Sequence, residues 1–409
     1  MRARYVIVIP DGAADEPHPS LAGKTALQAA RLLAMNRVAK RGIVGRSRNV
    51  PDQFLPASDV ATLSLFGYDP QRYYTGRAPL EAAGMGVVLG PDDWAVRCNL
   101  ITLEEGRMAD FTAGHITSEE GKLLLESLQA RLGWTGVEFL PGVSYRNLVI
   151  ERSQPGQPRF SDGTVTAPPH DHPDEPVLNH LPRGPGAEHL CTLMDAAASV
   201  LADHPVNNAR RSAGKRPANA IWLWGQGKAP AVPKFKDQHG LNGAIISGVD
   251  LVRGVGMLAG WTRIDVPGAT GYLDTDYAAK GRYAISALSD HDLVCVHIEA
   301  PDEASHEGRA DAKVQAIERI DELIVAPLLE ELQRYEAWRI LISPDHSTLL
   351  RTKAHDRAPV AWTMAGTGLP ASGLCYDEMT ARDGGGPFFD HGFQLMKRFL
   401  DLNWNGSGT

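Results

Sequence analysis

The chain has 409 residues, more than one ordinary hydrophobic core accommodates, so we expect two or three domains. Its hydrophobic content of 43% is sufficient to build them. With 41 basic and 49 acidic side chains the net charge is −8, which argues against a nucleic-acid-binding protein with a broad basic face and favours a small-molecule partner.

The cysteines and the apolar runs indicate the class of protein. Cys98, Cys191, Cys295 and Cys375 lie far apart with no CxxC spacing, which argues against a disulfide framework and a thiolate zinc site. The apolar run in residues 1–12 is too short for a signal peptide, and no run approaches the ~20 residues of a membrane span. We therefore predict a cytoplasmic protein without a membrane partner.

Short aliphatic runs predict buried strands. They are nearly continuous in hydrophobicity, as is typical of strands buried on both faces. In chain order the runs are 5–10, 218–224, 263–268, 292–300, 338–344 and 359–366. Helical patterns occupy 25–42, 250–261, 275–290 and 311–335. Their alternation over residues 240–366 predicts an α/β fold with a mostly parallel sheet flanked by helices.

The middle of the chain differs in composition. Residues 76–235 are rich in Pro and Gly and show fewer buried-strand signals. We predict that they form a separate inserted domain, and that residues 1–75 and 236–409 together form the discontinuous main domain. The borders lie at the turn in residues 75–79 and at the linker-like stretch 227–240.

Metal-ligating residue types recur where the apolar runs end. In an open α/β sheet, ligands bind beyond the carboxyl ends of the strands. Three such ends and the loop that follows supply carboxylates and imidazoles, which are ligands for Zn²⁺ or Mn²⁺. These residues are Asp11, Asp302, His306, Asp345, His346 and His355. They are too many for one tetrahedral ion and fit two neighbouring cations, an arrangement that clamps a phosphoryl group during in-line displacement.

Such a site needs a nucleophile, and Ser58 in the stretch PASDVATLSLFGYDP (56–70) is the candidate. A helical apolar pattern follows it, so its hydroxyl is expected at a helix N-terminus, where the positive end of the dipole favours an alkoxide and binds phosphate. The alternative is that Ser58 only caps that helix.

With these residues in place, the sequence resembles the cofactor-independent (2,3-bisphosphoglycerate-independent) phosphoglycerate mutases of the archaeal type, which are members of the alkaline phosphatase superfamily. The stretches that carry the resemblance span almost the whole chain in the family's order. They are 9–17, 57–70, 76–87, 266–281, 297–308 and 342–360.

The resemblance implies an alkaline-phosphatase-like sheet domain that carries an inserted α+β phosphotransfer domain. It implies that one metal is bound by Asp11, Ser58, Asp345 and His346, and the other by Asp302, His306 and His355. Mn²⁺ or Zn²⁺ best matches three histidines, while Mg²⁺ and Co²⁺ are also compatible with these ligand types. Ser58 would be transiently phosphorylated while 3-phosphoglycerate and 2-phosphoglycerate interconvert.

The inserted domain is then expected to close over the metals, exclude water and bring cations to the substrate. The candidates are His115, Arg146, Arg210 and Lys228, with Arg146 and Arg210 preferred because Arg holds a carboxylate or phosphate through two parallel bonds. Asp110 is the candidate base for the protons of glycerate. The alternative for each arginine is an ordinary surface position.

Other activities remain open at this point. Related proteins have been proposed to be homoserine kinases that use ATP, and a metal-dependent phosphatase or a non-catalytic metabolite sensor are further alternatives. The stretch TAPPHDHPDEP (166–176) holds two histidines and three acids that could bind a metal, but its prolines predict an exposed loop, so it ranks below the main site. The sequence does not indicate an oligomeric state.

Overall fold

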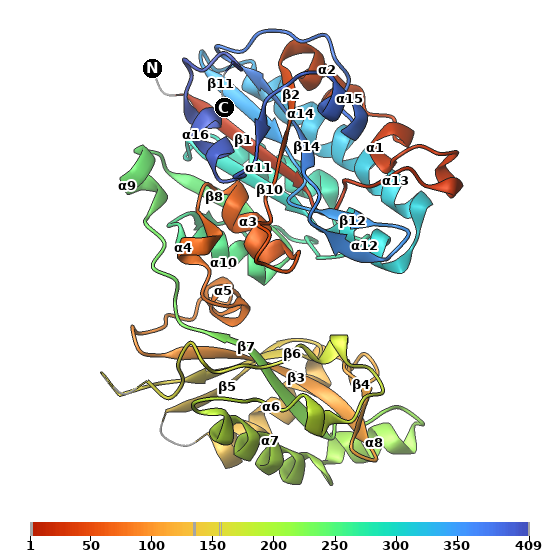
Figure 1. The fold of residues 1–409 in the computed structure, drawn as a ribbon, viewed down its shortest axis with the longest axis vertical. Coiled ribbons are helices and arrows are strands. Elements are labelled where there is room, and N and C mark those ends of the chain that lie inside the picture. The colour runs from red at the N-terminus through yellow and green to blue at the C-terminus, as the bar shows by residue number, and fades with distance from the viewer. Residues whose placement is uncertain (1–2, 134–135, 155, 157, 408–409) are drawn as a thin grey trace. The chain divides into compact units, whose positions relative to one another are not determined.

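The computed structural model describes residues 3–133, 136–154, 156 and 158–407. The chain forms two compact units (Figure 1). The first comprises Met1–Tyr74 and Ala231–Thr409, and the second comprises Thr75–Pro230. The sequence-based prediction places the domain boundaries between residues 75 and 76 and between residues 235 and 236.

The first unit is built on an eight-stranded, mostly parallel sheet, which confirms the predicted fold class. Its strands in spatial order are β15 (Phe388–Phe389), β2 (Ile43–Ser47), β14 (Val360–Gly366), β11 (Trp338–Ile342), β1 (Arg4–Pro10), β10 (Leu293–Ile298), β8 (Gly243–Ile246) and β9 (Thr262–Arg263). β1 lies in the middle and pairs in parallel with β10 and β11. β14 runs antiparallel to both of its neighbours, β11 and β2.

Helices cover both faces of this sheet (Figure 1). Val6 and Val8 of β1 share a core with the helices of one face, which are α1 (Ala26–Ala29), α2 (Leu33–Arg41), α11 (Tyr277–Ala287), α13 (Ala310–Ile320) and α14 (Ala326–Leu332). Tyr5, whose side chain points to the opposite face, contacts Phe399 of α16 (Gln394–Leu400). α10 (Asp250–Leu258) also packs on β8. Burial on both faces explains the continuous hydrophobicity of β1, β10 and β11.

Several element boundaries differ from the sequence-based prediction. The pattern at 25–42 forms two helices, α1 and α2, and the carboxylate of Asp321 accepts hydrogen bonds from the backbone N–H groups of Ala34 and Met35 at the start of α2. The pattern at 311–335 is interrupted between α13 and α14 by a π-helical turn, η4 (Asp321–Val325). The run at 263–268 yields only the two residues of β9. β2 and β8 were not predicted, since both are short and contain or begin with glycine.

The second unit has an antiparallel sheet with helices, so its class is α+β. The long buried strand β3 (Trp94–Glu104) pairs with β6 (Arg146–Glu151) on one edge and β7 (Ala220–Gly227) on the other. β4 (Arg107–Asp110) forms a hairpin with the end of β3, and β5 (Val137–Val143) pairs with β6. α6 (Ser118–Leu132) and α7 (Ala187–Leu201) pack against this sheet and share its core. The α+β class expected for the inserted domain is therefore confirmed, although its strands gave few signals in the sequence.

The remaining helices of the first unit are α3 (Ser58–Leu65), α4 (Pro70–Tyr73), α9 (Phe235–His239), α12 (Ala300–Glu307) and α15 (Glu378–Asp383). The second unit adds α5 (Arg77–Gly84) and α8 (Pro205–Ser212). A small hairpin of β12 (Ser347–Leu349) and β13 (Ala354–Asp356) follows β11. Within the described ranges, no helix is both long and apolar enough to cross a membrane.

Candidate functional site

The carboxyl ends of β1, β10 and β11 meet at one edge of the main sheet. Asp11 follows β1, and its backbone N–H still donates to the Ile298 carbonyl of β10 at 3.0 Å. Gly12 then turns with φ of +61°, and a Cβ there would lie 2.6 Å from oxygens of Asp302 and Thr348. Only glycine combines this backbone conformation with so close an approach, so the turn brings the segments after β1 and β10 together.

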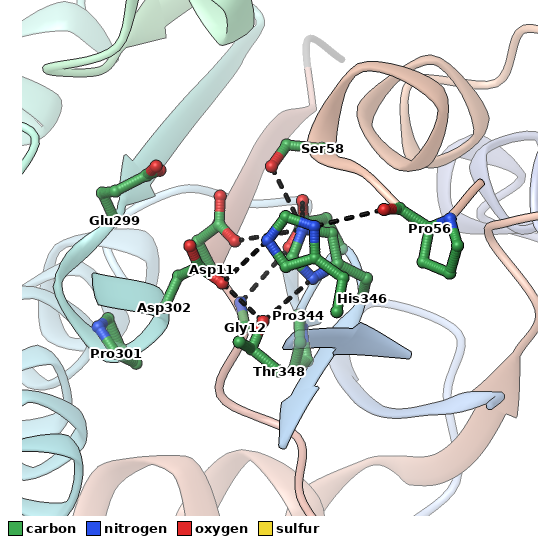
Figure 2. Close-up of polar contacts among 12 residues, drawn as sticks. Asp11, Gly12, Pro56, Ser58, Glu299, Pro301, Asp302, Pro344, His346 and Thr348 are labelled. Carbon is green, nitrogen blue, oxygen red and sulfur yellow. Dashed lines mark hydrogen bonds and ion pairs between the residues drawn. The ribbon is translucent and has the colours of Figure 1, made fainter. Parts of the chain in front are cut away.

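The first cluster surrounds the Nε2 atom of His346. This atom lies 3.1 Å from Ser58 Oγ, 3.4 Å from Asp345 Oδ2 and 3.6 Å from Asp11 Oδ1. Figure 2 shows the hydroxyl of Ser58 directed at the His346 ring, with Asp11 beside it. All four side chains are buried, and Ser58 is the most accessible at 8%. The four residues assigned to the first metal are therefore brought together.

Ser58 is not the cap of its helix. The N-cap of α3 is Ala57, which has an extended backbone, and Ser58 is the first helical residue. Its hydroxyl contacts His346 instead of a backbone N–H group of the first turn. The helix-cap alternative is therefore wrong, and the hydroxyl is held at a helix N-terminus, where the positive end of the dipole favours negative charge.

The second cluster consists of Asp302, His306 and His355. Asp302 and His306 lie one turn apart on α12, with His306 Nε2 at 3.2 Å from Asp302 Oδ2. His355 on β13 places its Nε2 3.4 Å from Asp302 Oδ1 and 2.9 Å from His306 Nε2. The three residues assigned to the second metal are therefore also brought together. His346 lies beside this cluster as well, with its ring centroid 4.2 Å from that of His355.

The hydrogen bonds at the outer side of each ring fix its tautomer. Nδ1 of His306 faces the Lys353 carbonyl at 2.9 Å, and Nδ1 of His355 faces the Pro56 carbonyl at 3.2 Å. A carbonyl only accepts, so in the neutral rings both Nδ1 atoms carry the hydrogen and both Nε2 atoms present lone pairs.

His346 is oriented in the same way. Thr348 donates its hydroxyl hydrogen to Asp302 and is therefore an acceptor for Nδ1 of His346 at 3.3 Å. Both contacts are drawn in Figure 2. Nε2 of His346 is then also an acceptor, and it faces the carboxylates of Asp11 and Asp345.

Two buried carboxylate oxygens suit a cation ligand. Asp11 Oδ1 and Asp345 Oδ2 are buried and have no hydrogen-bond partner among the described residues. Buried carboxylate oxygens are costly without a donor or a cation. The residue groups Asp11–Asp345–His346 and Asp302–His346–His355 each converge closely enough to hold an ion. The donor set therefore fits divalent cations.

The pKa directions follow from the crowding of like charges. Burial, together with repulsion from Asp345 and Glu299, raises the pKa of Asp11 well above its usual value. Burial also acts to raise the pKa of Asp302, but hydrogen bonds from His306 and His355 outweigh it and lower this pKa well below the usual range. Burial lowers the pKa of His306, yet its bond to Asp302 prevails and raises the pKa to about 9. These opposite directions show that the two clusters favour positive charge at the centre of the site.

His297 and Glu299 belong to the site but are not among the residues predicted from the sequence. His297 lies inside β10, and its Nε2 is 2.7 Å from Asp11 Oδ2 and 3.4 Å from Glu299 Oε2. Asp11, His297 and Glu299 form another group that could hold an ion. Burial lowers the pKa of His297 to about 3, so the ring is neutral. The available signal was a titratable side chain inside an otherwise apolar strand.

The second unit contains the residues predicted to bind substrate. Asp110 accepts hydrogen bonds from Thr112, Gly114 and Arg216, and although burial acts to raise its pKa, these bonds lower it. A carboxylate held this way is a poor base at neutral pH, so this prediction is not supported. His115 is exposed at the end of the same turn, with φ of +48°.

Arg210 is a structural residue rather than an exposed cation. Its guanidinium is 2% exposed and donates to Glu120 at 2.6 Å, to the Arg216 carbonyl at 2.8 Å and to the Ala113 carbonyl at 2.7 Å. All three nitrogens are thereby engaged within the unit. The expectation that Arg210 holds substrate is therefore replaced by a role in fixing the turn that carries His115.

Other arginines gather around Glu81 on α5. Glu81 accepts from Arg77 Nε at 3.1 Å and from Arg97 Nε at 2.9 Å. Burial acts to raise the pKa of Glu81, but Arg97, Arg77 and Arg146 together lower it. Arg97 stacks over the Trp224 ring at 4.2 Å, and burial lowers its pKa to about 10. Arg77 and Arg97 were not predicted, and the signal was an arginine within the apolar strand β3.

The two other predicted cations lie at the sheet of the same unit. Arg146 is exposed at the start of β6, and its Nε contacts the Tyr145 hydroxyl at 3.2 Å. Lys228 pairs with Asp92 at 3.3 Å, directly after β7. Three arginines around a single glutamate leave an excess of two positive charges, which suits an anionic ligand.

Comparison with known proteins gives a consistent result. The family model for 2,3-bisphosphoglycerate-independent phosphoglycerate mutase matches residues 39–207. A protein of Methanothrix thermoacetophila with that name is 49% identical over 384 residues, covering 93% of this chain and 96% of the relative. A Geobacter sulfurreducens protein named a probable enzyme of this kind is 47% identical over 404 residues, covering 97% of this chain and 100% of the relative.

Solved structures agree with this result. The PH0037 protein from Pyrococcus horikoshii superimposes with a TM-score of 0.81 at 29% identity, covering 100% of this chain and 99% of that one. The cofactor-independent phosphoglycerate mutase from Thermoplasma acidophilum gives a TM-score of 0.66 at 27% identity, covering 98% and 100%. With relatives of nearly half-identical sequence aligned along almost its whole length, the chain belongs to the family of 2,3-bisphosphoglycerate-independent phosphoglycerate mutases.

Proposed function

We propose that this protein interconverts 3-phosphoglycerate and 2-phosphoglycerate through a phosphoserine at Ser58, as a cytoplasmic enzyme of glycolysis and gluconeogenesis. The observation that carries the proposal is the contact between Ser58 Oγ and His346 Nε2 beside the buried carboxylates of Asp11 and Asp345. The hydroxyl faces this cluster and does not cap α3. The names of the relatives do not favour ATP-dependent phosphorylation of homoserine or simple phosphate hydrolysis.

Two divalent ions, with Mn²⁺ or Zn²⁺ as our preferred candidates, would be held by the two clusters. One ion would be bound by Asp11, Ser58, Asp345 and His346. The other ion would be bound by Asp302, His306 and His355. Bound there, they supply Lewis-acid stabilisation of charge on the phosphoryl oxygens and on the Ser58 oxygen. His297 and Thr348 support this arrangement, because they hydrogen-bond the outer atoms of Asp11, Asp302 and His346.

The chemistry has two matched halves. Ser58 Oγ bonds to phosphorus while the bond from phosphorus to the 3-oxygen of the substrate breaks, and the serine proton passes to that oxygen. The 2-oxygen of the retained glycerate then bonds to phosphorus, the bond to Ser58 Oγ breaks, and the proton of the 2-hydroxyl returns to Ser58. Water must be excluded between the halves, because its attack on phosphoserine would convert the enzyme into a phosphatase.

We propose that the arginines around Glu81 neutralise the substrate. Phosphoglycerate carries a phosphate and a carboxylate, and Arg77, Arg97 and Arg146 exceed the charge of Glu81 by two. Arg97 is buried between Glu81 and Trp224 and anchors the group, while Arg77 and the exposed Arg146 are the cations nearest to solvent. His115 and Lys228 remain secondary candidates.

The test is an enolase-coupled assay without added 2,3-bisphosphoglycerate. The protein should convert 3-phosphoglycerate to 2-phosphoglycerate, and Ser58→Ala should abolish this activity. The variant should bind at most one metal ion fewer than the unaltered protein. Ser64→Ala is the matched control, since Ser64 lies on the same helix with a buried hydroxyl outside both clusters. Activity retained by Ser58→Ala, or lost equally by Ser64→Ala, would contradict the proposal.

A further inference from the structure

A buried lysine lies between the segments that carry the metal-ligating residues of the first unit. Lys313 of α13 is 0% exposed, and its Nζ donates to Asp15 Oδ2 at 2.7 Å, to the Thr348 carbonyl at 2.8 Å and to the Ala14 carbonyl at 3.4 Å. An ammonium group has three hydrogens, so these acceptors satisfy it completely. The acceptors belong to residues other than those assigned to the two metals.

The acceptors come from two different ligand-bearing segments. Ala14 and Asp15 follow Asp11 in the segment after β1, and Thr348 of β12 follows His346 in the segment after β11. The backbone N–H of Thr348 also donates to the Ala14 carbonyl at 3.3 Å. The ammonium therefore lies where these two segments meet.

Thr348 connects this junction to both clusters. Its hydroxyl donates to Asp302 of the second cluster and accepts from Nδ1 of His346 in the first at 3.3 Å (Figure 2). In the hairpin of β12 and β13, Thr348 is also paired with His355. A shift of the Thr348 backbone would therefore break the hydroxyl contacts that orient a ligand of each cluster.

The helix that carries the lysine is itself tied to the second cluster. α13 packs against α12, which carries Asp302 and His306. From α13 the lysine reaches the backbone of Ala14 and Thr348. Its contacts thus fix the segments that follow β1 and β11 relative to the helices that follow β10.

Stability alone does not account for an ion pair in this place. Taking the charges of Lys313 and Asp15 out of water is costly, and well-packed apolar side chains of similar volume are often at least as stabilising. Burial accordingly lowers the pKa of Lys313, while Asp15 acts against this shift. An apolar side chain has no donor for the Ala14 and Thr348 carbonyls, so these contacts are what the lysine adds.

We propose that Lys313 is a positioning residue of the two-cation site, which holds the segments of Asp11 and His346 in place through the Ala14 and Thr348 carbonyls and thereby sets the affinity for divalent cations. The inference rests on the proposed two-cation function. It assigns Lys313 no part in the phosphoryl transfer itself.

The test measures binding of Mn²⁺ to the metal-free, full-length protein by titration calorimetry, independently of activity. Lys313→Met/Asp15→Asn removes the ammonium without leaving an unpaired carboxylate, while Asp15→Asn alone keeps the lysine and both of its carbonyl contacts. The half-saturating Mn²⁺ concentration should be roughly 10- to 100-fold higher in the double variant than in Asp15→Asn, as is typical when support of a metal ligand is lost. Asp15→Asn itself should stay close to the unaltered protein.

Arg339→Met is the matched control for a general loss of stability. Arg339 lies at the start of β11 and is also a fully buried cation of the first unit. It donates to the backbone carbonyls of Thr367, Arg398 and Trp404. Urea unfolding of the metal-free proteins should show a loss of stability in Arg339→Met as well as in the double variant, but only the double variant should bind Mn²⁺ more weakly.

The outcomes separate this inference from the proposed function. Equal Mn²⁺ affinity in the double variant and Asp15→Asn would overturn the inference alone, and so would equal weakening in Arg339→Met. An unaltered protein that binds neither Mn²⁺ nor Zn²⁺ would overturn the two-cation function and the inference with it.

Thr348→Val tests the same link if the double variant does not fold. It removes the hydroxyl between Asp302 and His346 and keeps the carbonyl that Lys313 contacts. It should also raise the half-saturating Mn²⁺ concentration at least tenfold. An unaltered Mn²⁺ affinity in Thr348→Val would contradict the inference.

Discussion

The Nε2 atoms of His306 and His355 lie 2.9 Å apart, although the tautomer of each neutral ring leaves both without a hydrogen. They face the carboxylate of Asp302, so three acceptors surround one point. Acceptors so close repel each other unless a proton or a metal ion lies among them. The raised pKa of His306, about 9, shows how strongly the cluster attracts positive charge.

Removal of the metals should therefore destabilise the protein. Ions that bind only the folded state at about 100 times their dissociation constant add about 2.7 kcal/mol each. We expect a chelator to lower the thermal midpoint by several degrees, and Mn²⁺ to restore it. An unchanged midpoint in protein shown by elemental analysis to be metal-free would contradict the two-cation assignment.

His297 is expected to set the affinity of the first metal. Nε2 of His297 donates to the carboxylate oxygen Asp11 Oδ2 at 2.7 Å, so Nδ1 of the neutral ring is an acceptor for the Ser247 hydroxyl at 3.0 Å. Removing such an outer partner typically costs 10- to 100-fold in metal affinity. His297→Asn should thus require roughly 10- to 100-fold more Mn²⁺ for half-maximal activity.

The matched control for that experiment is His291→Asn, a partly buried histidine of the same unit whose Nδ1 lies 3.1 Å from the Ala287 carbonyl of α11. It should leave the Mn²⁺ requirement unchanged. The two variants are compared at equal substrate, and activity at saturating Mn²⁺ is measured separately from the half-saturation value. A His297→Asn enzyme with the unaltered Mn²⁺ requirement would refute the role given to this ring.

The main site was predictable because its residues follow apolar runs. Asp11 and Asp345 are the first carboxylates after β1 and β11, and Asp302 lies four residues after β10. Parallel pairing brings the ends of these three strands together. His297 was not predictable in this way, because it lies within the strand β10 and its partner Asp11 is 286 residues away in sequence. Whether an arginine faces a ligand or a carbonyl also depends on tertiary contacts, which is why Arg210 was misassigned and Arg97 was overlooked.

Arg146 and Arg210 should give opposite phenotypes. Arg146→Ala should raise KM for phosphoglycerate at least tenfold with little change in the free energy of unfolding, because the side chain is exposed at the start of β6. Arg210→Ala should lower that free energy by roughly 3 kcal/mol, because Glu120 and two backbone carbonyls lose their donor. Steady-state kinetics and urea unfolding distinguish the two effects.

Arg211→Ala is the control for both arginine variants. Arg211 neighbours Arg210 on α8 but is exposed and contacts Asn208 and the Ala202 carbonyl. It should change neither KM nor stability appreciably. An unchanged KM in Arg146→Ala would remove this arginine from the proposed substrate group, and a stable Arg210→Ala with raised KM would restore the original assignment.

Glu378 is expected to make stability depend on pH. This carboxylate accepts from the Thr25 hydroxyl at 2.6 Å and the Asp15 backbone at 3.1 Å, and burial raises its pKa from 4.5 to about 7. The folded state therefore binds its proton more tightly than the unfolded state does. Its contribution to stability is complete below pH 4.5 and is lost as the pH rises to about 7, which amounts to about 3 kcal/mol.

Glu378→Gln should remove this loss, since the amide keeps an oxygen acceptor and cannot ionise. Urea unfolding at pH 5 and pH 8, at one fixed metal concentration, measures the free energy of unfolding of the variant and of the unaltered protein. The unaltered protein should lose more stability than the variant over that interval. Glu330→Gln, an exposed position on α14, should follow the unaltered protein. Parallel pH profiles for Glu378→Gln and the unaltered protein would show that Glu378 does not retain its proton in the fold.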